Sequence, residues 1–92
     1  MVEQKDTITI VVNARQKVVP VEELTPDGEI SFGQVLALAS DTPGWLRPGT
    51  NIVYTVSFRN AAGRPPDGVL LEGQDVKIQD GTIFNATATD RS

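Results

Sequence analysis

The chain of 92 residues contains no cysteine and no histidine. It therefore cannot form a disulfide, a thiolate nucleophile or an iron–sulfur cluster, and it lacks the side chains of the common zinc sites. Catalytic dyads built on histidine are excluded for the same reason. Most enzyme classes need one of these groups. We therefore expect a protein that is not an enzyme and that binds no cofactor.

Long apolar runs and clusters of basic residues are absent as well. No stretch approaches the roughly 18 apolar residues of a membrane-spanning helix, so we expect no membrane partner. The polar start, Met1–Asp6, does not resemble a secretory signal, which favours a cytoplasmic location. The eight basic residues are scattered and the formal net charge is −4, which argues against the basic face that binds nucleic acid.

Carboxylates are the chemistry that remains. The twelve Asp and Glu residues are spread along the chain, without the dense Asp/Asn alternation of a calcium-binding loop. Scattered acids normally solvate a surface, so we expect no metal site and no catalytic residue. A hydrolase with paired carboxylates would need a deep pocket, which so small a fold does not favour. With 39% hydrophobic residues, the chain suits a single domain with one small core.

The first elements read as two strands. The β-branched run Thr7–Val12 alternates its aliphatic residues at period two, which predicts a half-buried strand. Asn13 follows and tolerates a left-handed conformation, so we expect the chain to turn there. Lys17–Val21 then predicts a returning strand. Because Pro20 cannot donate to a ladder, that strand lies at an edge or ends at this residue.

A helix is predicted from Ser31. Ser31 and Gln34 form the capping-box pattern, and Ile30 and Val35 are spaced for a hydrophobic staple. The apolar stripe at helical spacing comprises Phe32, Val35, Leu36 and Ala39. We expect about three turns, ending a little after Ser40. One apolar stripe is best buried against a sheet, which indicates an α+β architecture.

The second half of the chain predicts further strands. Ile52–Phe58 alternates cleanly and is expected to be central, and Val69–Leu71 is short. Val76–Gln79 and Thr82–Phe84 flank Asp80-Gly81, which is a strong hairpin signal. A hairpin, a helix that crosses its face and a last strand that returns to the middle form the β-grasp arrangement. We therefore predict a mixed sheet of four to five strands packed on one helix.

Two places are candidates for binding a partner. A two-residue turn at Asp80-Gly81 would put Ile78 opposite Ile83, and the alternation after Phe84 indicates that Phe84 points inward. Ile78 and Ile83 would then form an outward patch, unless a bulge buries both. Trp45 lies in a loop with Pro and Gly on both sides. It is either an interface anchor or a lid folded over the end of the helix.

The order and spacing of these segments resemble the bacterial multi-ubiquitin family. The resemblance is carried by Val12-Asn13 at the end of the first strand, the helix segment Ile30–Ala39, and then Tyr54–Phe58, Gly68–Gly73 and Val76–Ser92. It extends over roughly residues 7 to 92. Single segments are generic strand and turn patterns, so the specificity lies in their order and in the ending after Asp80-Gly81.

The resemblance implies a ubiquitin-like modifier that catalyses nothing itself. Its partners would be an activating enzyme, a conjugating enzyme and a deconjugating peptidase, together with the target proteins. We expect a flexible N-terminus over residues 1–6, a ubiquitin-like β-grasp domain over residues 7–89 and a C-terminal tail over residues 90–92. The conjugating residues implied by the resemblance are therefore Asp90, Arg91 and Ser92, with the carboxylate of Ser92 adenylated by ATP.

The tail leaves three functions open. No glycine follows Gly81, whereas ubiquitin and the related sulfur carriers end in two glycines. A side chain at the last position implies a wider enzyme channel, proteolytic maturation or no conjugation. Without conjugation, the domain would be a β-grasp module that binds partners non-covalently. A sulfur carrier would need a C-terminal thiocarboxylate, for which the missing glycines are a poor fit.

Overall fold

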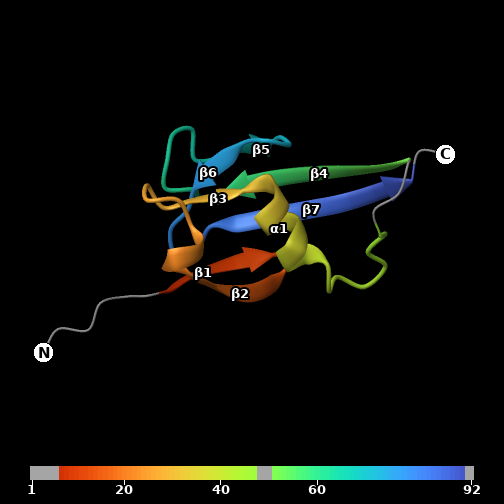
Figure 1. The fold of residues 1–92 in the computed structure, drawn as a ribbon, viewed down its shortest axis with the longest axis horizontal. Helices are drawn as coiled ribbons and strands as arrows, with labels where there is room; N and C mark the ends of the chain where they lie inside the picture. Colours follow the sequence, from red (N-terminus) through yellow and green to blue (C-terminus); the bar gives the residue numbers. More distant parts are fainter. Residues whose placement is uncertain (1–6, 48–50, 91–92) are drawn as a thin grey trace, which may run out of the picture.

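The computed structural model describes residues 7–47 and 51–90, and in it one α-helix covers one face of a five-stranded sheet (Figure 1). In chain order the elements are β1 (Thr7–Val12), β2 (Arg15–Pro20), the 3₁₀ helix η1 (Val21–Glu23), β3 (Glu29–Ser31), α1 (Phe32–Ala39), β4 (Ile52–Arg59), β5 (Gly68–Leu70), β6 (Asp75–Lys77) and β7 (Ile83–Asp90). β3 and β6 form a separate two-stranded sheet.

The first hairpin forms as predicted, with a tighter turn. Asn13 and Ala14 both have positive φ, at 52° and 67°, and they form a two-residue turn. Turns of this kind match the twist of the two strands they join. β2 therefore begins at Arg15, two positions before the predicted strand. Pro20 is the last residue of β2, which is an edge strand, so both predicted placements of the proline hold.

The predicted capping box is present at the start of α1. The Gln34 N–H donates to Ser31 Oγ at 3.2 Å, and the Ser31 N–H donates to Gln34 Oε1 at 2.9 Å. The helix has eight residues, about two turns rather than the predicted three. At its end the Ser40 N–H and Oγ both donate to the carbonyl of Ala37, at 3.3 and 2.7 Å, so the last turn tightens to the 3₁₀ spacing. Neither α1 nor any other helix of the described residues is long and apolar enough to cross a membrane.

β7 occupies the middle of the large sheet. It runs antiparallel to β4 along its whole length, from Ile83 opposite Arg59 to Asp90 opposite Ile52. On its other side it is parallel to β1, with Val12 opposite Phe84. The strand order is β2-β1-β7-β4-β5, and α1 lies on one face. The predicted α+β class, with a mixed five-stranded sheet and one helix, is confirmed.

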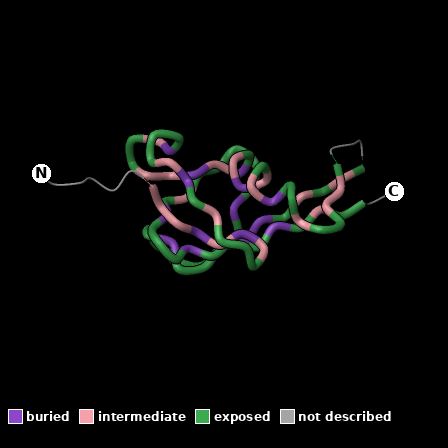
Figure 2. The backbone as a smooth tube through the Cα atoms, turned by 90° about the horizontal axis from the view of Figure 1, so that it is seen from below, coloured by how far each residue is buried: buried purple, intermediate pink, exposed green. Residues whose placement is uncertain are grey.

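The core lies between the helix and the covered face of the sheet (Figure 2). Phe84 is completely buried, and its ring lies 6.4 Å from that of Phe58. Ile10, Val12, Val56 and Ala86 are buried on the same face of the sheet, as period two predicts. From the helix side, Val35 and Ala39 have no exposed surface. These contacts fix which face of every strand turns inward.

The predicted hairpin between Val76–Gln79 and Thr82–Phe84 is wrong. The chain does turn around Asp80-Gly81, but β6 pairs with β3, whose Ile30 lies opposite Val76. The turn therefore joins two different sheets. It is held by the Gly81 N–H, which donates to the Thr9 carbonyl at 2.9 Å, and by the Gly81 φ of 94°, which suits glycine. β3, which completes the small sheet, was not predicted.

Candidate functional site

The face of the large sheet that turns away from α1 is open to solvent (Figure 1). Its residues follow from the pairing register, because residues opposite each other share a face and neighbours in a strand alternate. We call this surface the outer sheet face. It comprises Thr7, Thr9, Val11, Gln16, Val18, Pro20, Val53, Thr55, Ser57, Arg59, Val69, Ile83, Asn85, Thr87 and Thr89.

Charge is nearly absent from the outer sheet face. Arg59 is its one charged residue, although 22% of the chain is charged. The aliphatic side chains Val18, Val53, Val69 and Ile83 are 37–58% exposed there, among threonine, serine and amide groups. Protein interfaces are depleted of charge at their centre, because a buried unpaired charge is costly. The outer sheet face therefore has the composition of a docking surface.

The predicted patch of Ile78 and Ile83 does not form. Ile83 is 37% exposed and lies on the outer sheet face, as expected if the two isoleucines formed an outward patch. Ile78 is only 4% exposed and belongs to the core, so it cannot bind a partner. The reason is that the two residues lie in different sheets, with the Ile78 N–H donating to the Gly28 carbonyl at 3.1 Å. The alternative of a bulge that buries both residues is wrong as well.

Trp45 folds back against the body of the domain. Its ring stacks on that of Tyr54, with 5.5 Å between the centroids and 29° between the planes. The Tyr54 hydroxyl in turn donates to the carbonyl of Leu46 at 3.2 Å. Trp45 is half-buried and packs against the hydrophobic core. The geometry is that of a lid beyond the end of α1, which was one of the two predicted roles.

The predicted conjugation tail is only partly described. Asp90 is the last residue of β7 and pairs with Ile52, so the strand extends one residue past the predicted domain boundary at residue 89. Arg91 and Ser92 lie outside the described residues, as does the segment 1–6. The end of β7 lies at one end of the long axis of the molecule, beyond α1 and far from the start of β1 (Figure 1). Thr89 and Asp90 are exposed.

Sequence reasoning missed part of the outer sheet face. Val18 and Val69 stand in predicted strands, but a period-two pattern does not say which face is covered until the register is known. Val53 alternates with the buried side of β4, and this spacing was available as a signal. The face also depends on pairing between distant strands, such as Val11 opposite Ile83.

The Asp41 carboxylate has a lowered pKa, and it lies away from the outer sheet face. The Lys17 Nζ donates to Asp41 Oδ2 at 2.6 Å, and Arg15 Nη1 lies 3.6 Å from the same oxygen. The hydrogen bond from Lys17, with the charges of both basic groups, lowers the pKa of Asp41 below 3.8. This is an exposed ion pair that ties β2 to the segment after α1. Within residues 7–47 and 51–90, no group of Asp and Glu could hold a metal ion.

The sheet order, the single helix on one face and the exposed end of the central strand define a ubiquitin-like β-grasp domain. The family model described as Multiubiquitin matches residues 8–90. The chain therefore belongs to the multiubiquitin family. Neither a curated protein nor a solved structure matches the chain.

Proposed function

We propose that this domain is a ubiquitin-like protein modifier that is attached to target proteins through its C-terminal carboxylate. The proposal is supported by membership of the multiubiquitin family and by the position of the end of β7. Because β7 pairs with β4 up to Asp90, the last described residue is an exposed one at the end of the sheet that lies beyond α1 (Figure 1). A segment that starts there can enter the channel of an enzyme without any loss of core contacts.

The chemistry would take place in the activating and conjugating enzymes. The carboxylate of Ser92 would attack the α-phosphorus of ATP, releasing pyrophosphate and forming an acyl-adenylate. An enzyme thiol or a target amine would then displace AMP, with loss of a proton, to give a thioester or an amide. A deconjugating peptidase would hydrolyse that amide. The modifier supplies the carboxylate and a docking surface, which agrees with the absence of cysteine and histidine from its sequence.

Conjugation is tested with the cognate activating and conjugating enzymes that the proposal requires. With ATP, intact mass should show the chain linked to these enzymes and to a substrate amine. A chain that lacks Arg91 and Ser92 keeps β7 complete but should give no linked species. A modifier role is ruled out if no linked species forms with the full chain, or if the shortened chain is linked equally well.

The second candidate is a module that binds partners without conjugation. The observation that favours it is the outer sheet face, which carries Arg59 as its one charge and exposes Ile83 and Val18. In that case Ile83→Asp should abolish capture of the partner enzymes, while removal of Arg91 and Ser92 leaves capture unchanged. If instead Ile83→Asp still captures the enzymes and the shortened chain does not, the modifier is favoured. Covalent linkage needs the tail, whereas docking through the outer sheet face does not.

A further inference from the structure

The large sheet has an open position beside the first half of β4. β4 pairs with β7 from Ile52 to Arg59, but β5 pairs only with Val56, Ser57 and Phe58. In the part of the chain that the structure describes, no strand lies beside Ile52–Thr55 on the side away from β7. Alternate residues of an antiparallel strand direct their N–H and C=O groups to the same side. This edge therefore offers backbone donors and acceptors to an added strand.

Among residues 7–47 and 51–90 the chain does not fill this position, because it turns away directly after β5. The Leu71 N–H donates to Gln74 Oε1 at 3.1 Å, and the Gln74 N–H donates to the Leu71 carbonyl at 2.9 Å. Gly73, with a φ of 86°, closes the turn. The open position thus lies in line with β5 and is limited at one end by this turn.

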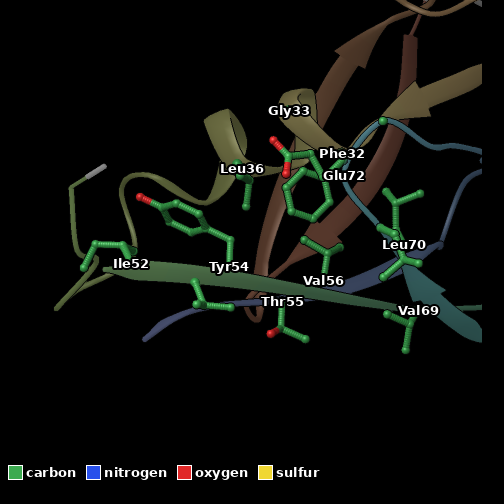
Figure 3. A pocket seen from close by; sticks show the side chains of 13 residues that line it. Phe32, Gly33, Leu36, Ile52, Tyr54, Thr55, Val56, Val69, Leu70 and Glu72 are labelled. Carbon is green, nitrogen blue, oxygen red and sulfur yellow. The ribbon is translucent and has the colours of Figure 1, made fainter. Parts of the chain in front are cut away.

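An apolar groove lies above the open position, between α1 and β4. Two adjoining hollows share Gly33, Leu36 and Tyr54, and together they reach from Trp45 to Leu71. Phe32 and Leu36 point into the groove from the helix, and Tyr54 points into it from β4 (Figure 3). On one face, the side chains of an added strand would enter this groove. On the other face they would lie beside the outer sheet face.

Gly33 indicates that the groove is kept open. It is an exposed residue of the first turn of α1 and lines both hollows. A Cβ at this position would meet no atom within 4 Å, and Gly33 is not among the residues with positive φ. Neither packing nor backbone conformation requires glycine here, and glycine is disfavoured inside helices. Because Gly33 has no side chain, the groove is wider at this position.

Charge gives the groove a direction. Glu72 is the charged residue that lines the hollow at the β5 end, and Arg47 is the one that lines the hollow at the Trp45 end. Neither has an ion-pair partner among residues 7–47 and 51–90. A strand antiparallel to β4 runs in the direction of β5, and so from Glu72 toward Arg47. Charge complementarity then requires a basic residue at its start and an acidic residue at its end.

We propose that this groove binds an extended segment of a partner protein, which adds as a short strand beside Ile52–Thr55. The segment carries a basic residue near Glu72, apolar side chains below α1 and an acidic residue near Arg47. Main-chain hydrogen bonds supply affinity in such strand addition, and alternate side chains supply specificity. The groove lies between α1 and the open edge of β4, where Val53, Thr55 and Val69 of the outer sheet face also line it. Binding there needs no activation of the C-terminus.

The probe is the capped peptide acetyl-KVTVTD-amide, titrated into the full chain labelled with ¹⁵N. Amide shifts should change at Gly33, at Leu71 and along Ile52–Thr55, with a Kd below about 1 mM. The peptide acetyl-DVTVTK-amide, with its charges exchanged, should bind at least about tenfold more weakly. A version with N-methyl groups at alternate positions should not bind, because it cannot donate to the edge of β4.

Two variants separate this groove from other surfaces. Gly33→Gln fills the groove and raises helix propensity, so it should stay folded and bind the peptide at least about tenfold more weakly. Ile83→Asp on the outer sheet face should bind the peptide as the parent does. The proposal is overturned if no shifts occur up to about 5 mM peptide, if the shifts centre on Val11, Asn85 and Thr87 and spare Gly33 and Leu71, or if Gly33→Gln binds normally. Failure of conjugation would leave all of these results unchanged.

Discussion

The side chain of Asn13 holds the backbone of Ala86 in the central strand, where Asn13 Oδ1 accepts the Ala86 N–H at 2.7 Å. Asn13 also donates from Nδ2 to Thr42 Oγ1 at 2.9 Å, and its own N–H donates to the Phe84 carbonyl at 3.0 Å. One turn residue thereby joins the first hairpin, β7 and the loop after α1. The parallel pairing of β1 and β7 ends at Asn13. Beyond that point the Asn13 side chain, in place of a backbone carbonyl, accepts the next hydrogen bond from β7.

Asn13→Ala should lower the free energy of unfolding by about 1–3 kcal/mol, because it leaves the Ala86 N–H without its acceptor and puts alanine at a φ of 52°. Asn13→Gly permits that φ and should be less damaging. Asn13→Asp keeps the acceptor and should retain most of the stability. Urea denaturation measures all three. Asn85→Ala, on the outer sheet face, is the matched control, and an equal loss there would contradict the assigned role of Asn13.

Thr82 is completely buried, and its hydroxyl makes two hydrogen bonds in the turn between the two sheets. Thr82 Oγ1 accepts the Gln79 N–H at 3.0 Å and donates to the Asn60 carbonyl at 2.9 Å. Thr82→Val keeps the shape but leaves the Gln79 N–H without its acceptor, while the Asn60 carbonyl keeps only the hydrogen bond from Gln79 Nε2 at 3.2 Å. We therefore expect a loss of about 1–3 kcal/mol by denaturation. Thr82→Ser should lose less. If valine proves as stable as threonine, the hydroxyl does not hold this turn.

Ile78 and Ile83 should respond oppositely to a charge. Ile78→Asp buries a carboxylate in the core and should cost more than about 3 kcal/mol, while Ile83→Asp on an exposed site should cost less than about 1 kcal/mol. Thermal unfolding followed by circular dichroism compares the two variants. Equal destabilisation would show that both side chains are buried, and the corrected pairing of β6 would then be wrong.

Asp41 should contribute a pH-dependent increment of stability. Its pKa is lowered in the folded state by the hydrogen bond from Lys17, so the increment is present above 3.8 and is lost as the pH falls through the folded-state value. The difference in urea midpoint between the parent and Asp41→Asn should be small at neutral pH and vanish in acid. It should also shrink in high salt, because the Asp41 carboxylate is exposed. A difference that persists in acid would contradict the ion pair as its source.

Local signals in the sequence predicted most of the elements, and distant pairings decided what they missed. The capping box of Ser31 and Gln34 needs only residues within one turn, so it could be predicted directly. The Asp80-Gly81 turn is also a local signal, but whether it closes a hairpin depends on β3, which competes for β6. Ile78 was misplaced for this reason. The docking composition of the outer sheet face likewise became visible only with the register.

The central claim is that the C-terminal carboxylate is activated by ATP, and the exchange of labelled pyrophosphate into ATP tests it most directly. Two semisynthetic chains are each incubated with the cognate activating enzyme that the proposal requires: one ends in the carboxylate of Ser92 and the other in its amide. The account predicts exchange with the acid and none with the amide, since only the acid can form an acyl-adenylate. No exchange with the acid, or equal exchange with both chains, would contradict it.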